Sequence, residues 1–170
     1  MSKLNVDQKA IIDLLSDKKA DFLIPDYQRP YAWSEEQCQT LWDDIFLFSF
    51  PDNNYEAFDD NEEYFLGSIV TYKNENGKSE VIDGQQRLTT LMLMLRAFYD
   101  KFESMKDKNS ILTRDRIEKC IWKTDTFGTA DKNTLKIDSE VATDNDKDEF
   151  LELLRTGVVK KGSKSQYVLN

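Results

Sequence analysis

The segment Val81–Leu91, with the sequence Val-Ile-Asp-Gly-Gln-Gln-Arg-Leu-Thr-Thr-Leu, constrains the fold more than any other part of the chain. Its first two residues are β-branched, which is typical of a strand, and Gly84 permits a tight turn. The helix predicted from Leu88 to Phe102 has apolar residues around most of its circumference, Met92 and Met94 among them. We therefore expect a buried central helix, with both methionines in the core, directly after a strand.

The residues before this strand-to-helix junction predict a sheet. Tyr64–Lys73 is rich in β-branched and aromatic residues, Asn76-Gly77 is a hairpin signal, and Ser79–Ile82 is the partner strand. Asp21–Ile24 reads as a further short strand that ends at Pro25. The hairpin and the strand near Phe22 should form one sheet with the 88–102 helix packed on it. The fold class is α+β, a small mixed sheet flanked by helices.

The rest of the chain is predicted to be mostly helical. Helices are expected at 6–15, from the capping box Ser34-Glu35-Glu36-Gln37 to Phe46, at 113–121, and at 144–154 with Gly157 as its stop; a short strand is expected at 134–137. Residues 50–61 are acidic and turn-rich, which predicts a mobile loop. Residues 160–164 are predicted to form a basic, flexible turn. We divide the chain into a domain at 1–105 and a mostly helical extension at 106–170. The end at 167–170 reads like the start of another element, so we expect truncation before a further domain.

The chain contains no histidine, and this excludes several mechanisms. A Ser-His-Asp or Cys-His mechanism, an HNH-type nuclease and the usual histidine zinc ligands all need that residue. Catalysis would rest on Asp, Glu, Lys, Arg or Tyr, or on a metal held by carboxylates. Cys38 and Cys120 lie in helical segments without metal-ligand spacing, so we expect both to be reduced, partly buried and inert.

The net charge of −9 predicts weak non-specific affinity for DNA. Many acids lie within 52–63 and 138–152, whereas Arg29, Arg87 and Arg96 lie outside these runs. A locally basic pocket is therefore compatible with the acidic total. No apolar run approaches the ~20 residues of a membrane helix, and the N-terminus lacks a signal pattern. We expect a cytoplasmic protein without membrane association.

The pentapeptide Asp83–Arg87 is a candidate anion site. Unpaired N–H groups at a helix start and the positive end of the helix dipole attract phosphate. Gly84 lets the backbone approach a ligand, and Gln85 and Gln86 offer amide groups. Arg87 carries a planar guanidinium group whose N–H donors match phosphate oxygens. A plain strand-to-helix turn with a surface arginine is the alternative.

The segment Ile24–Trp33 is the second candidate, with Gln28, Arg29 and three aromatic residues held between two prolines. Aromatic rings can wall a pocket or stack on a base, and arginine can bind phosphate. In the alternative, Tyr27, Tyr31 and Trp33 staple the loop to the core. Each segment follows a strand and contains a Gln and an Arg, so we expect Arg29 and Arg87 to face one cleft.

Three stretches together resemble a known family: 24–33, Phe-Leu-Gly-Ser-Ile at 65–69, and 81–91. They are similar to the N-terminal domain of GmrSD-type restriction proteins, whose fold is similar to ParB and sulfiredoxin. The resemblance implies binding and hydrolysis of a nucleoside triphosphate with Mg²⁺, coupled to a C-terminal HNH-type nuclease domain that is missing here. Members restrict phage DNA with modified bases or a modified backbone.

The resemblance also implies roles for individual residues. The expected nucleotide-binding residues are Tyr27, Gln28, Arg29, Gly84, Gln85 and Arg87, and the expected catalytic residues are Asp83, Gln86 and Arg87. Asp83 is the candidate Mg²⁺ ligand. Two alternatives stay open: a ParB-like DNA-contacting module with a nucleotide switch, and a non-catalytic interaction domain. The base, the DNA modification and the oligomeric state are open as well.

Overall fold

The computed structural model describes residues 5–141 and 147–158 of the chain. Its main sheet has the strand order β2-β3-β1-β6, formed by Val70–Lys73, Ser79–Asp83, Phe22–Ile24 and Ile137–Ser139. The hairpin pair β2–β3 is antiparallel, while β1 lies parallel to both β3 and β6. The hairpin and the strand at Phe22 thus share one mixed sheet, and the predicted α+β class is confirmed.

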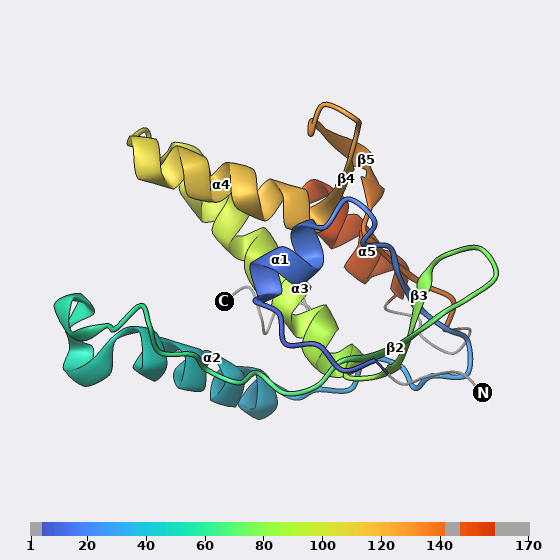
Figure 1. The fold of residues 1–170 in the computed structure, drawn as a ribbon, viewed down its shortest axis with the longest axis horizontal. Helices are drawn as coiled ribbons and strands as arrows, with labels where there is room; N and C mark the ends of the chain where they lie inside the picture. The colour runs from blue at the N-terminus through green and yellow to red at the C-terminus, as the bar shows by residue number, and fades with distance from the viewer. Residues whose placement is uncertain (1–4, 142–146, 159–170) are drawn as a thin grey trace.

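Helix α3, Gln85–Lys101, is the central element that the apolar pattern predicts (Figure 1). Leu88, Met92 and Leu93 are fully buried, and Leu91 and Met94 are nearly so. The helix begins three residues earlier than predicted, because Gly84 adopts a left-handed φ of 86° and joins β3 to α3 without a linker. The first turn of the helix therefore consists of the polar motif itself.

The other helices are α1 Ile11–Ser16, α2 Glu35–Ser49, α4 Lys108–Ile121 and α5 Lys147–Thr156. The capping box at Ser34 and Gln37 is formed as predicted. Gly157, with φ 78°, donates its N–H to the Leu153 carbonyl and ends α5. Helix α4 begins five residues before its predicted start, because the Asp107 side chain accepts a hydrogen bond from the Ser110 N–H.

Several predicted elements are wrong in extent. Residues 6–10 are not helical, since Ala10 is extended at the start of α1. Residues 64–69 are not a strand, and Gly67 has a φ of 97° there. The predicted strand at 134–137 is two strands, β5 Ala130–Leu135 and β6, which Lys136 separates. β4, Trp122–Thr124, was not predicted and pairs with β5 in a second sheet.

Short 3-10 turns complete the structure: η1 Pro51–Asn53, η2 Tyr55–Ala57 and η3 Phe102–Ser104. The first two lie in the acidic segment 50–61, whose predicted mobility stays a prediction. The predicted features at 160–164 and 167–170, and residues 144–146 of the predicted last helix, lie outside the described residues. None of the described helices is long and apolar enough to cross a membrane.

Residues from both sides of the predicted boundary at 105 build one sheet and one core. β6 pairs with β1, and Trp122, Leu153 and Leu154 share a buried cluster with Leu88 and Met92. The described part of the segment after residue 105 contributes two helices and three strands.

Lys136, between β5 and β6, has no exposed surface. Its Nζ donates to the carbonyl oxygens of Leu15, at 2.9 Å, and Asp17, at 2.7 Å. Burial lowers the pKa of Lys136. These bonds satisfy carbonyl groups at the C-terminal end of α1 and fasten that helix to the sheet.

Candidate functional site

A cavity of about 240 Å³ lies where β3 ends and α3 begins. Its lining includes seven of the residues predicted for the site, together with Trp33 and Ser68; the full lining is Gln28, Arg29, Trp33, Ser68, Asp83, Gly84, Gln85, Gln86 and Arg87. Arg29 and Arg87 therefore both line one cavity. Tyr27 does not line it and is 63% exposed. Ser68 was not predicted, although it belongs to the Phe-Leu-Gly-Ser-Ile stretch.

The N-terminus of α3 forms one wall of this cavity. Gly84 occupies the N-cap position, and within the described residues no side chain caps the first turn. The N–H groups of that turn and the helix dipole are thus available to an anion. A Cβ on Gly84 would lie 2.8 Å from the Ser68 carbonyl oxygen and 3.2 Å from the Ile69 Cα. Both the left-handed backbone and the close approach of 68–69 require glycine here.

Arg87 is held in place by the backbone of the 67–68 segment. Its Nη1 donates to the Ser68 carbonyl oxygen at 3.0 Å. A Cβ on Gly67 would lie 2.7 Å from the Arg87 Cζ, so the guanidinium packs directly against that glycine. The bond to Ser68 fixes the guanidinium group and uses one of its five N–H donors. The other donors remain available to a ligand.

Gln86 is occupied by the loop that precedes α2. Its Oε1 accepts the N–H groups of Ala32, at 2.7 Å, and Trp33, at 3.2 Å, and its Nε2 donates to the Pro30 carbonyl at 3.1 Å. Gln86 is buried. Its amide therefore fastens the 30–33 backbone to the helix start.

Tyr31 strengthens the same attachment. Its hydroxyl lies 2.9 Å from the Thr90 Oγ1 and 3.3 Å from the Cys38 Sγ. Burial raises the pKa of Tyr31, so this hydroxyl stays protonated at neutral pH. Tyr31 thus acts as the staple that the alternative interpretation of the loop describes.

Two hydrogen bonds, one from Gln28 and one from Gln85, fix the beginning of the same loop to β3 and α3. The Gln28 Nε2 donates to the Ile82 carbonyl at 3.0 Å, and the Gln85 Nε2 donates to the Arg29 carbonyl at 2.6 Å. The Gln85 Oε1 is buried and has no hydrogen-bond partner among the described residues. An unpaired buried acceptor costs about 1–3 kcal/mol, which a donor group of a ligand or a water molecule would recover.

The charge of the lining is basic on balance, with two arginines and one carboxylate. Asp83, which is exposed, is the only carboxylate among the described lining residues. No cluster of three His, Cys, Asp or Glu side chains suited to a metal occurs in the described ranges. A single carboxylate suits an Mg²⁺ ion that arrives with phosphates and keeps several waters.

Arg96, the third arginine outside the acidic runs, does not line this cavity and is held by contacts within the protein. It is 5% exposed, forms an ion pair with Asp100 at 2.6 Å, and stacks over Tyr99 and Trp122. Cys38 and Cys120 are free thiols, as expected, and both are buried rather than only partly buried.

Fold and cavity together define a class: a small α+β domain with a basic cavity at a strand-to-helix turn. Residues 11–168 match the family model described as the GmrSD restriction endonuclease, N-terminal domain. The chain belongs to this family, and the resemblance of its three motifs is confirmed. It is a domain of a phage-defence restriction protein, from a family in which a separate nuclease domain cleaves modified DNA. A search of curated proteins finds no match.

Proposed function

We propose that this domain binds a nucleoside triphosphate with Mg²⁺ in the cavity and hydrolyses it as the regulatory step of restriction. The observation that supports this most is the helix start. The uncapped N-terminus of α3 opens into a cavity that Arg29 and Arg87 also line. Phosphate oxygens can accept hydrogen bonds from the N–H groups of the helix start and from both guanidinium groups.

The size of the cavity indicates which part of the nucleotide enters. About 240 Å³ is below the roughly 300–1,000 Å³ of pockets that enclose a whole drug-sized ligand. The phosphates therefore occupy the cavity in this proposal, and the nucleoside extends beyond it. Tyr27, exposed on the neighbouring loop, is the side chain that would stack on the base.

The individual residues then have distinct roles. Arg87, anchored to Ser68, and Arg29 neutralise phosphate charge, and Gly84 lets the backbone N–H groups approach. The unpaired Gln85 Oε1 accepts a hydrogen bond from a hydroxyl or amine of the ligand. Mg²⁺ would be held by Asp83 and the phosphates, and would supply further neutralisation of charge.

Gln86 has a different role from the catalytic one that the motif suggests. Its Oε1 already accepts two backbone N–H groups and its Nε2 donates to a third partner. We therefore treat Gln86 as a positioning residue that holds the loop.

Calorimetric titration with ATP, GTP, CTP and UTP in the presence of MgCl₂ tests the proposal. Arg87→Ala should weaken binding about 30- to 150-fold, the equivalent of about 2–3 kcal/mol for a charge-assisted contact. Arg155→Ala is the control, because Arg155 is a partly exposed arginine on α5, paired with Glu152, that does not line the cavity. Absence of binding at millimolar concentration of all four nucleotides would contradict the proposal, as would unfolding of Arg87→Ala.

A further inference from the structure

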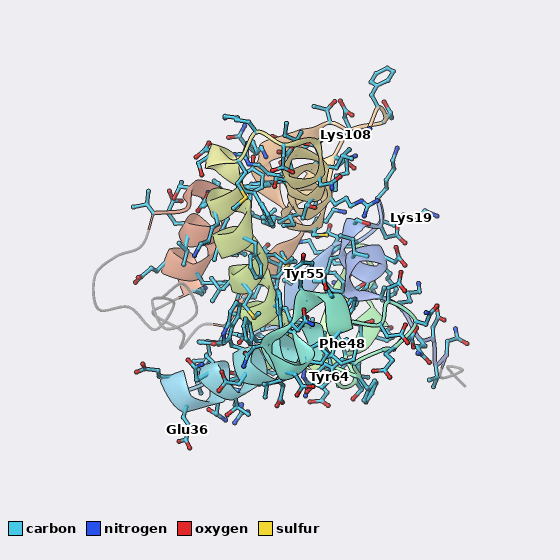
Figure 2. The ribbon with its side chains drawn as sticks, turned by 90° about the vertical axis from the view of Figure 1, so that its left-hand side faces the viewer. Lys19, Glu36, Phe48, Tyr55, Tyr64 and Lys108 are labelled. Carbon is cyan, nitrogen blue, oxygen red and sulfur yellow. The ribbon has the colours of Figure 1, made fainter. Side chains whose placement is uncertain are left out.

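Helix α2 and the residues after it form an arm at one edge of the molecule, defined here as residues 35–66. Figure 1 shows α2 and the turns η1 and η2 extending away from the sheet. Phe48 on α2 contacts Phe58 and Tyr64, with ring centroids 5.8 and 5.6 Å apart, so the chain returns along the helix. Figure 2 shows Phe48 and Tyr64 side by side on this arm.

An aromatic stripe continues from the arm onto α3. Trp42, Phe46 and Phe50 follow one another at helical spacing, with ring centroids 6.0 and 5.0 Å apart. Trp42 also contacts Phe98, and Phe98 contacts Phe102, at 6.1 and 6.4 Å. The three rings on the arm each keep more than a third of their surface exposed, and Leu47 beside them is 62% exposed. An apolar face of this kind on a soluble domain marks a protein interface.

The charge of the arm has one sign only. From Pro30 to Tyr72 the chain contains ten Asp or Glu residues and no Lys or Arg. This stretch alone carries −10, against −9 for the whole chain, so the remainder is close to neutral. DNA is repelled by such a surface, and a second copy docked through the same face would bring two −10 stretches together.

We propose that the aromatic stripe docks a basic amphipathic helix of a partner polypeptide. Its apolar side chains would cover the rings, and its Lys or Arg side chains would pair with acids of the arm. Long basic side chains suit this face doubly, because their stems cover apolar surface and their charges lie favourably over aromatic rings. This docking is independent of the nucleotide cavity, since none of the stripe residues lines it.

A designed peptide is the probe: a labelled helix of about 18 residues, five turns, with leucines on one face and lysines on the other. Fluorescence anisotropy should show binding that weakens as NaCl rises from about 0.05 M to about 0.5 M. The double variant Phe46→Ser/Phe50→Ser should bind it at least about tenfold more weakly, since aromatic anchors carry most of the energy of such interfaces. Circular dichroism checks that the variant is folded.

Two controls separate docking from unspecific attraction. Phe127, 93% exposed on the turn between β4 and β5, is an aromatic residue off the stripe, and Phe127→Ser should bind like the wild type. A peptide with glutamate in place of every lysine should not bind. Equal binding of both peptides, an equal loss in Phe127→Ser, or no binding of the lysine peptide would each overturn the proposal. A dimer that sedimentation detects in the wild type and not in Phe46→Ser/Phe50→Ser would assign the stripe to a second copy instead.

Discussion

Replacement of Gln86 by methionine should destabilise the fold substantially, although Gln86 belongs to the motif that resembles a nucleotide site. Methionine keeps the length of the side chain and removes three hydrogen bonds, two from the N–H groups of Ala32 and Trp33 and one to the Pro30 carbonyl. At about 1 kcal/mol net for each bond, the free energy of unfolding should fall by about 3 kcal/mol. For a chain of this size, that corresponds to a Tm roughly 6–12 °C lower.

Urea denaturation followed by circular dichroism measures this loss directly. The control is Gln39→Met, since Gln39 is an exposed glutamine on α2 with a single hydrogen bond, to Asp43, and should change stability by about 0.5 kcal/mol or less. If Gln86→Met unfolds at the same urea midpoint as the wild type, the amide does not hold the loop. The catalytic role that the motif suggests for Gln86 would then be the better explanation of any loss of activity.

Three further outcomes are expected. Lys136→Met should lower stability by about 2 kcal/mol or more in urea denaturation, because the two carbonyls at the end of α1 lose their donor. Burial raises the pKa of Cys120 to about 11, so the wild type should lose stability as pH rises from about 8.5 toward 11, and Cys120→Ala should lose less in urea titrations across that range. Gly67→Ala should displace the Arg87 guanidinium and weaken nucleotide binding several-fold in calorimetry, whereas Gly77→Ala, which shares the positive φ but faces open space, should bind normally.

Patterns within one element predicted the centre of the fold well. The apolar residues of α3 surround the helix, so its burial follows from the sequence whatever packs against it. The hairpin signal at Asn76-Gly77 and the capping box at Ser34 are equally local. For the same reason the α+β class and the shared cavity of Arg29 and Arg87 could be predicted, since each arginine follows a strand of one sheet.

Features that depend on distant partners could not be predicted. β5 contains Asp131, Lys132 and Asn133, which are poor strand formers, and it exists because Leu135 pairs with Trp122 of β4. Lys136 would be expected at the surface. Its burial is favourable only because the end of α1 packs beside it and supplies carbonyl acceptors.

The motif Asp83–Arg87 combines two tasks that the sequence does not separate. Gln85 and Gln86 donate to the backbone of the 29–33 loop, while Asp83, Gly84 and Arg87 contribute to the cavity without contacting that backbone through the bonds described. The same glutamines that fasten the loop therefore place Arg29 beside Arg87. Substitution of any motif residue should reduce activity, but through two different causes. A measurement of stability beside each measurement of binding distinguishes a residue that would contact the proposed phosphates from one that builds the cavity.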